Sequence, residues 1–153
     1  MTIINIGCGE QEYGDERVDF VDTKTTTNVF DLNEKFPIDD HVFDEVYCNS
    51  VLEHIGNVKQ FLEECMRILE PSGKFFFRTD NANYIGFQLQ NHQSYIENED
   101  WSKDDKHYYL FKPEHLINLF GDKIEITYSC PNNKLFFLPK KYKCMHLEVR
   151  GIK

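Results

Sequence analysis

Four short apolar segments in the first half of the chain each end in, or precede, small, acidic or amide residues. These segments are 2–6, 17–22, 29–30 and 42–48, and the residues at their ends are Gly7, Cys8 and Gly9, then Asp22, then Asp31 and Leu32, then Asn49 and Ser50. Glycine lets a backbone approach a ligand closely, and carboxylates accept hydrogen bonds from ribose hydroxyls or an exocyclic amine. Each feature alone also fits an ordinary turn or cap. Their conjunction predicts a site for a nucleoside-like ligand.

Three further residues could take or position a proton. His54 follows the fourth apolar segment, Asp80 follows the fifth, and His107 stands beside a pair of tyrosines. A general base is useful where an acceptor must lose a proton during the reaction. The alternatives are a packed helix residue for His54, a helix cap for Asp80 and a surface position for His107. The other histidines show no spacing typical of metal ligands, so no metal is predicted.

A mostly parallel sheet is predicted to position these residues. Asn57 and Gln60 form a capping box before a run of apolar residues at helical spacing, and Pro113 begins a second helix. Residues 74–79 are a fifth strand. Residues 124–128 and 145–149 alternate and follow each other without a helix, so we expect them to pair antiparallel. The order predicts an α/β sheet with helices on both faces and a ligand site at the carboxyl ends of the strands.

The length of 153 residues predicts a single domain, residues 1–153. Residues 81–112 are polar and rich in aromatic side chains, without a clear period. We interpret them as a cap over the carboxyl ends of the strands. The alternative is a segment that only covers apolar surface.

The overall charge and the cysteines narrow the partners and the compartment. A formal net charge of -9 argues against a nucleic-acid partner, because phosphate backbones attract basic surfaces. No apolar run is long enough to span a bilayer, and the amino terminus lacks the pattern of a signal peptide, so neither a membrane partner nor export is expected. Five cysteines at wide spacing fit neither a disulfide framework nor a zinc site. We expect reduced thiols in a cytoplasmic protein.

The residues after the first glycines distinguish between nucleoside ligands. The dinucleotide fingerprint needs a third glycine, and here Glu10, Gln11 and Glu12 follow Gly9. Two acids beside the turn would also repel a pyrophosphate. This disfavours an NAD-linked oxidoreductase. A ligand with positive charge, such as the sulfonium and ammonium of S-adenosylmethionine, suits the turn better.

At this point the chain resembles class I S-adenosylmethionine-dependent methyltransferases, in the compact part of their type 11 branch. Four segments carry the resemblance in the family's order: Ile3-Ile4-Asn5-Ile6-Gly7-Cys8-Gly9, residues 37–47 (PIDDHVFDEVY), residues 50–55 (SVLEHI) and residues 68–74 (ILEPSGK). The resemblance implies a Rossmann-like, seven-stranded sheet whose last strand is antiparallel. It also implies that Gly7 and Gly9 face the methionine part of the cofactor, Asp22 the ribose, Asp31 and Leu32 the adenine, and Asn49 and Ser50 its flank.

The chain departs from the family in its first crossover. Residues 7–16 include the glycine turn and leave too little chain for a full helix before the second strand. We therefore expect the first crossover helix to be reduced to a turn or replaced by a loop.

Two functions follow from these observations. The first is S-adenosylmethionine-dependent methyl transfer to a small-molecule acceptor, and the resemblance to compact relatives suggests a sugar or a cell-envelope precursor. The second is a non-catalytic, methyltransferase-like module that binds cofactor or a protein. The shortened crossover favours the second, and the retained Gly7, Gly9, Asp22 and Asp31 favour the first.

Overall fold

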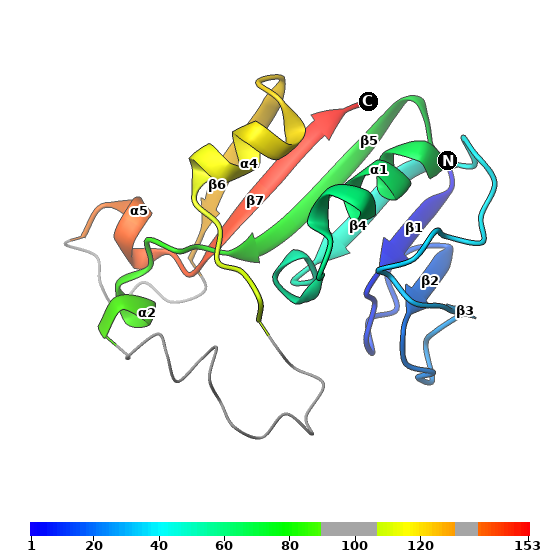
Figure 1. Cartoon of the computed structure of the whole chain (residues 1–153), viewed down its shortest axis with the longest axis horizontal. Coiled ribbons are helices and arrows are strands. Elements are labelled where there is room, and N and C mark those ends of the chain that lie inside the picture. The colour runs from blue at the N-terminus through cyan, green and yellow to red at the C-terminus, as the bar shows by residue number, and fades with distance from the viewer. Residues whose placement is uncertain (90–106, 131–137) are drawn as a thin grey trace.

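Seven strands form a single sheet in the computed structural model, which describes residues 1–89, 107–130 and 138–153 (Figure 1). The strands are β1 (Ile3–Ile6), β2 (Glu16–Asp19), β3 (Asn28–Val29), β4 (Phe43–Asn49), β5 (Leu69–Asp80), β6 (Ile124–Ser129) and β7 (His146–Ile152). The helices are η1 (Leu52–His54), α1 (Val58–Ile68), α2 (Ile85–Leu89), α4 (Pro113–Phe120) and α5 (Lys140–Lys143).

The strand order is β3-β2-β1-β4-β5-β7-β6. The first five strands pair in parallel, and β7 runs antiparallel to both β5 and β6. The order reverses between β1 and β4, which puts the carboxyl ends of these two strands beside a crevice. The predicted fold class, a mostly parallel seven-stranded sheet with an antiparallel last strand, is confirmed.

The two main helices begin where the sequence predicts. The Asn57 side chain accepts a hydrogen bond from the Gln60 backbone nitrogen at 3.3 Å and caps α1. Pro113 occupies the first turn of α4, and Gly121 ends that helix with a φ of 84°. Both helices bury an apolar side against the sheet, including Phe61 of α1 and Leu116 of α4.

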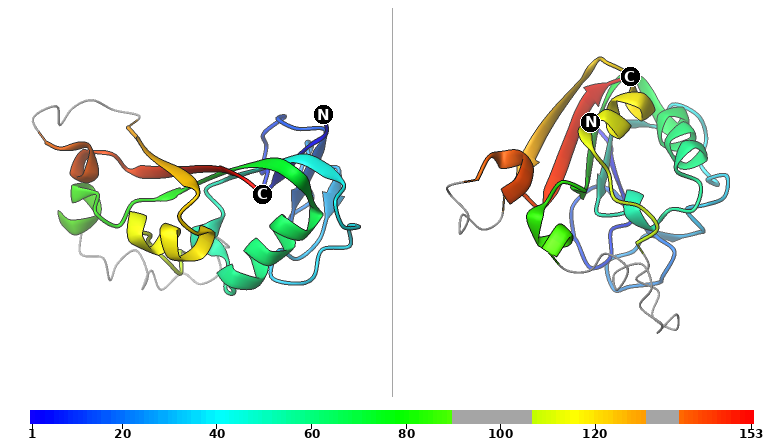
Figure 2. Two further views of the ribbon diagram at one scale, coloured as in Figure 1. Left: turned by 90° about the horizontal axis from the view of Figure 1, so that it is seen from above. Right: turned by 60° about the vertical axis from the view of Figure 1, so that its left-hand side comes forward.

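Both of these helices lie on the same face of the sheet (Figures 1 and 2). The prediction of helices on both faces is therefore wrong for the described part of the chain. The cause lies in the crossovers. Residues 7–15, between β1 and β2, contain no helix, as the shortness of this first crossover led us to expect. Residues 20–27, between β2 and β3, contain no helix either.

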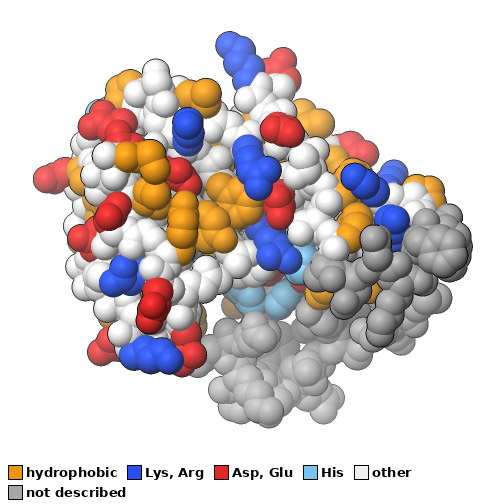
Figure 3. All heavy atoms as spheres, turned by 180° about the vertical axis from the view of Figure 1, so that it is seen from behind, with side chains coloured by type: hydrophobic (Ala, Val, Ile, Leu, Met, Phe, Trp, Pro, Cys, Tyr) orange, Lys and Arg blue, Asp and Glu red, His pale blue; other side chains and the backbone are white. Residues whose placement is uncertain are grey.

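A row of aromatic side chains crosses the face without α1 and α4. The ring centroids of Tyr13 and Tyr47 lie 4.6 Å apart, and those of Tyr47 and Phe76 lie 4.9 Å apart. The Arg150 guanidinium lies 5.0 Å from the centre of the Phe76 ring. Figure 3 shows this side of the molecule, where apolar and charged side chains are interspersed. The loop that replaces the first crossover helix thus covers part of the sheet with Tyr13.

The end of β6 lies beside the start of β7, and a disulfide at this place corrects the expectation that all cysteines are reduced. Cys130 and Cys144, fourteen residues apart, have Cα atoms 4.3 Å apart and form a disulfide. The prediction of reduced thiols throughout is therefore wrong for these two cysteines, because their wide spacing in the sequence hides a contact that antiparallel pairing of β6 and β7 creates. A short helix, α5, also lies between these strands, where none was expected. Cys8, Cys48 and Cys65 are free and buried.

Among the described residues, no helix has the length and apolar character needed to cross a membrane. Of the predicted cap, residues 90–106 lie outside the described residues, so the cap as a whole stays a prediction. Its described carboxyl end packs on η1, because the backbone nitrogen of Tyr108 donates to the Glu53 carbonyl oxygen at 2.7 Å.

Candidate functional site

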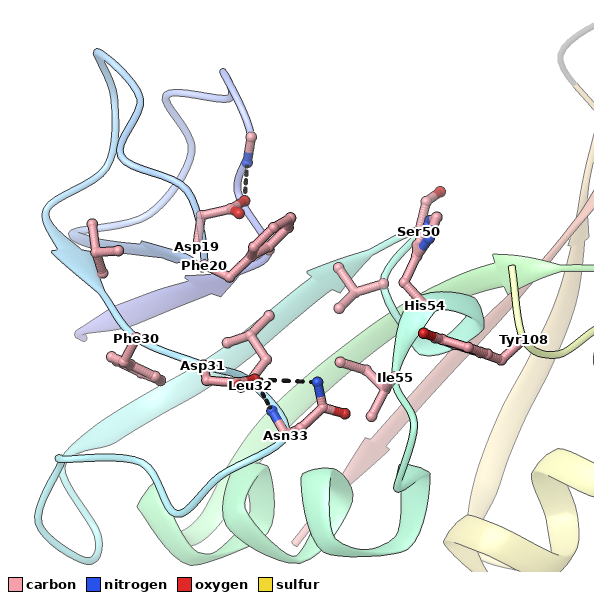
Figure 4. A pocket seen from close by; sticks show the side chains of 14 residues that line it. Asp19, Phe20, Phe30, Asp31, Leu32, Asn33, Ser50, His54, Ile55 and Tyr108 are labelled. Atoms are coloured by element: carbon pink, nitrogen blue, oxygen red, sulfur yellow. Dashed lines mark hydrogen bonds between the residues drawn. The ribbon is translucent and has the colours of Figure 1, made fainter. Parts of the chain in front are cut away.

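A pocket of about 700 Å³ opens at the carboxyl ends of β1 to β4 (Figure 4). Its lining comes from the turn after β1, the ends of β2 and β3, the turn after β4, η1 and the described end of the cap. The lining residues are Gly7, Gly9, Asp19, Phe20, Val29, Phe30, Asp31, Leu32, Asn33, Ser50, Val51, His54, Ile55 and Tyr108.

The glycine turn at one side of the pocket needs its glycines. Gly7 and Gly9 have φ angles of 69° and 52°, in the left-handed region that favours glycine. A Cβ on Gly7 would lie 2.1 Å from a methyl carbon of Val51. A Cβ on Gly9 would meet nothing within 4 Å. Gly9 therefore leaves space open beside the pocket.

Polar contacts hold the backbone of Gly9 on both sides. Its nitrogen donates to Asp19 Oδ2 at 2.8 Å. Its carbonyl oxygen accepts hydrogen bonds from the Thr23 hydroxyl at 2.7 Å and the Thr25 hydroxyl at 2.9 Å. The turn is thus fixed in place before any ligand binds, which reduces the entropy lost on binding.

The acid at the end of β2 is Asp19, and not Asp22. β2 ends at Asp19, three residues earlier than predicted, and Asp19 lines the pocket while Asp22 is exposed outside the lining. Asp19 accepts hydrogen bonds from the Gly9 and Val21 backbone nitrogens. A carboxylate has about four lone-pair sites, so Asp19 can still accept hydrogen bonds from a ligand.

A second acid stands at the end of β3. Asp31 Oδ1 accepts hydrogen bonds from the Asn33 backbone nitrogen at 2.8 Å and from its side-chain nitrogen at 3.1 Å. Asn33 Oδ1 in turn accepts from the Gly56 nitrogen at 2.8 Å. These bonds tie the loop after β3 to the segment between η1 and α1. Figure 4 shows Asp31, Leu32 and Asn33 together along one wall.

Apolar side chains complete the walls around these acids. They are Phe20, Val29, Phe30, Leu32, Val51 and Ile55. Phe20 directly follows Asp19 and is 54% exposed, which is unusual for so large an apolar side chain. A flat aromatic ligand would cover this surface while its polar edge faces the acids.

His54, Asp80 and His107, which were predicted to take or position a proton, lie close together. They are at the end of the pocket opposite Asp19. His54 lines the pocket, and its ring centroid is 4.3 Å from that of His107. His107 Nδ1 lies 3.1 Å from Asp80 Oδ2. Asp80 and His107 are not part of the lining and lie behind His54. The fold therefore brings these three residues, which lie far apart in the sequence, into one cluster.

Two further groups join this cluster. Glu53 is fully buried, and its Oε2 accepts a hydrogen bond from the Thr79 hydroxyl at 2.8 Å. Burial raises the pKa of Glu53 to about 7. His146 Nε2 lies 3.7 Å from Asp80 Oδ1, and burial, followed by nearby Arg78, lowers the pKa of His146.

The other predicted binding residues divide into two groups. Gly7, Gly9, Asp31, Leu32 and Ser50 line the pocket, whereas Cys8, Asp22 and Asn49 do not. Cys8 is buried beneath the turn. Asp19 was not predicted, because Phe20 and Val21 extend the apolar run past the end of β2. Glu53 lies within the motif SVLEHI but was assigned no role, because the sequence alone does not show that an acid is buried.

The class I methyltransferase fold is defined by this strand order and by the antiparallel β7. The pocket lies where such a fold binds its ligand, at the point where the strand order reverses, and it contains the glycines and the two acids that end strands. Comparison with known proteins agrees. Residues 6–77 match the methyltransferase domain family. This match covers less than half of the chain, and together with the fold it makes the chain similar to class I, S-adenosylmethionine-dependent methyltransferase domains.

The solved structures similar to this chain share its fold at low sequence identity. A SAM-dependent methyltransferase of Mesorhizobium loti is 17% identical with a TM-score of 0.69, and the alignment covers 99% of this chain and 90% of that chain. One from Thermotoga maritima is 15% identical, also with a TM-score of 0.69, and covers 99% of this chain and 82% of that chain.

Curated relatives match shorter stretches. The mitochondrial ubiquinone biosynthesis O-methyltransferase of Rattus norvegicus is 29% identical over 69 residues, which are 45% of this chain and 20% of that protein. A sterol 4-C-methyltransferase of Caenorhabditis elegans is 27% identical over 110 residues, 71% of this chain and 28% of that protein. The chain thus aligns with less than a third of either relative.

Proposed function

We propose that this chain transfers a methyl group from S-adenosylmethionine to a small-molecule acceptor. The observation that carries the proposal is the pairing of Gly9 with Asp19. The Gly9 nitrogen donates to the Asp19 carboxylate, and both residues line the same pocket beside open space. The names of the two curated relatives, which refer to ubiquinone biosynthesis and to a sterol, support a small-molecule acceptor.

The residues of the pocket fit the parts of this methyl donor. Asp19 would accept hydrogen bonds from the ribose hydroxyls, and Asp31, with its neighbours, would face the adenine edge. Phe20, Leu32 and Ile55 offer apolar surface to the purine. Gly7 lines the pocket beside the methionine part, and Gly9 leaves room for it. When bound, the donor supplies an electrophilic methyl group on its sulfonium.

The cluster at the other end would receive the acceptor. His54 reaches the pocket, and Asp80 lies against His107 behind it. A hydroxyl acceptor placed here would face the His54 imidazole, with His107 and the buried Asp80 carboxylate behind it, which favours loss of its proton. The lining orients the two reactants, and such alignment accounts for a large part of the barrier reduction in transfers between bound molecules. A sugar or cell-envelope precursor stays our prediction for the acceptor.

Two neighbouring acids provide a matched test by calorimetric titration with S-adenosylmethionine. Asp19→Asn keeps one oxygen for the Gly9 nitrogen but removes the charge, and we expect at least about a tenfold loss of affinity, or about 1.4 kcal/mol. Asp22→Asn, at an exposed site outside the lining, should bind as the natural chain does. Thermal unfolding of each variant checks that the fold is intact.

The opposite ranking of the two variants would contradict the assignment of Asp19. Absence of any binding by the natural chain at millimolar ligand would overturn the proposed function itself. Formation of S-adenosylhomocysteine in the presence of sugar acceptors then separates an enzyme from a module that only binds the donor.

A further inference from the structure

Three side chains around the acceptor end of the pocket come together with the ligand types of a transition-metal site. Glu53 and His54 lie on η1, and His107 lies at the described end of the cap, 53 residues further along the chain. One carboxylate oxygen of Glu53 and one ring nitrogen of each histidine lie within 4.8 Å of one another. Three atoms at this spacing can all reach one ion at about 2.0–2.2 Å after small side-chain adjustments.

Within the described part of the chain, the hydrogen bonds around Glu53 leave one of its carboxylate oxygens without a donor. Its Oε2 accepts from the Thr79 hydroxyl. Its Oε1 is buried and has no hydrogen-bond partner among the described residues. A buried acceptor left without a partner costs free energy, so such an atom in a native structure needs an explanation. A cation bound to Oε1 supplies one.

Asp80 stands where a second carboxylate is expected around a metal-binding histidine. Its Oδ2 lies 3.1 Å from His107 Nδ1. A hydrogen bond from Nδ1 to this carboxylate would hold the His107 ring in the tautomer whose lone pair is on Nε2. Metal-binding histidines commonly have such a carboxylate behind them.

The charges also point to a divalent cation. Glu53 and Asp80 are both buried, at 0% and 3% exposure. The histidines beside these two carboxylates carry a positive charge only when they are protonated. Buried charges are costly unless they are paired or coordinate a metal. One divalent ion with two neutral imidazoles and two carboxylates gives a cluster with no net charge.

We propose that Glu53, His54 and His107 bind a divalent first-row transition metal ion, with Asp80 as the positioning residue behind His107. Two imidazoles and one carboxylate favour zinc, iron, cobalt or nickel over magnesium and calcium, which prefer all-oxygen sites. Three protein ligands leave coordination positions open for water or another molecule.

The metal site lies at the acceptor end of the pocket, which gives the ion a role in activating the acceptor. This role rests on the proposed function. His54 belongs both to the triad and to the pocket lining, so the open positions face the acceptor end. An acceptor hydroxyl bound to the ion would have a lowered pKa and a fixed orientation. The two histidines would then act as ligands, and the ion would take over the activation of the hydroxyl from a free imidazole.

Titration of the whole chain with Co²⁺, after removal of bound metal with a chelator, tests the site without any measurement of activity. We expect visible absorption bands from one Co²⁺ per chain, abolished by competing Zn²⁺, without the sulfur charge-transfer band that a cysteine ligand gives. Glu53→Gln and His107→Asn should lose the bands. Asp80→Asn should keep them with an affinity lowered about tenfold or more.

His115→Asn is the matched control, because His115 is an exposed histidine on α4 outside the triad. It should bind Co²⁺ as the natural chain does. Absence of the bands in the natural chain, or bands of equal affinity in Glu53→Gln and His107→Asn, would overturn the metal proposal.

Calorimetry with S-adenosylmethionine on the same metal-free samples keeps the two proposals apart. Donor binding without Co²⁺ binding leaves the proposed function standing and removes the metal. Co²⁺ binding without donor binding does the reverse: the site exists, and its role in methyl transfer is rejected. Folding of the Glu53→Gln variant is checked by its thermal unfolding, and His54→Asn provides a second ligand variant that does not alter the buried acid.

Discussion

A methyl group added at Gly9 tests the pocket with little disturbance of the fold. The φ angle of Gly9 is 52°, and a Cβ there meets nothing within 4 Å. Gly121 is the control outside the pocket lining: it ends α4 with a φ of 84° and a ψ of -177°, and its Cβ also meets open space. Almost only glycine adopts that combination of φ and ψ, so Gly121→Ala imposes more backbone strain than Gly9→Ala, but away from the pocket.

The expected stability change follows from that strain. An alanine in the left-handed region costs about 1–2 kcal/mol, and the lower entropy of the unfolded chain returns part of it. We expect Gly9→Ala to lose about 1 kcal/mol of unfolding free energy, which lowers the Tm of a domain of this size by about 2–4 °C. Gly121→Ala should lose more, because alanine rarely adopts the backbone conformation of Gly121.

Only Gly9→Ala should change binding of the donor. The added methyl would occupy space where the main chain contacts the ligand, so we expect the Kd for S-adenosylmethionine to rise at least about tenfold, or about 1.4 kcal/mol. Differential scanning calorimetry measures the stability, and titration calorimetry measures the affinity. Equal affinities of Gly9→Ala and Gly121→Ala would refute the reasoning that places the donor against the glycine turn.

Two further predictions concern the packing that supports the site. Gly7→Ala should destabilise the fold by about 3 kcal/mol in urea unfolding, because the new Cβ combines left-handed strain with a 2.1 Å approach to Val51, and Val51→Ala in the same chain should recover part of the loss. Arg67→Met should cost about 2 kcal/mol at neutral pH, because Arg67 donates to the backbone oxygens of Phe36 and Ile38 and to the carboxylate of Glu64. The hydrogen bond from Arg67 lowers the pKa of Glu64 below its ordinary value of 4.5. The stability that the Arg67–Glu64 pair contributes is therefore present above that pH and is lost as the pH falls through the native pKa of Glu64. A stability difference between natural chain and variant that stays constant down to low pH would contradict this prediction.

Local signals in the sequence were sufficient for the elements that frame the pocket. Asn57 and Pro113 mark helix starts because capping and the fixed φ of proline act within one turn. Gly7 and Gly9 were informative for a similar reason, since the left-handed backbone they allow is a property of single residues. The order of strands and helices then gave the sheet.

Features that depend on burial or on contacts distant in the chain were harder to predict. Apolar residues after Asp19 concealed the end of β2, so Asp22 was assigned in its place. The disulfide between Cys130 and Cys144 depends on antiparallel pairing of β6 and β7. Glu53 acquires its raised pKa only through the packing around it, which no single residue reveals.

A crystal structure of the chain grown with S-adenosylhomocysteine tests the central claim most directly. We expect the ribose hydroxyls within hydrogen-bond distance of the Asp19 carboxylate, the purine between Phe20 and Ile55, and the amino-acid part against Gly7 and Gly9. A ligand bound elsewhere, or a pocket that stays empty in crystals saturated with this compound, would contradict the account.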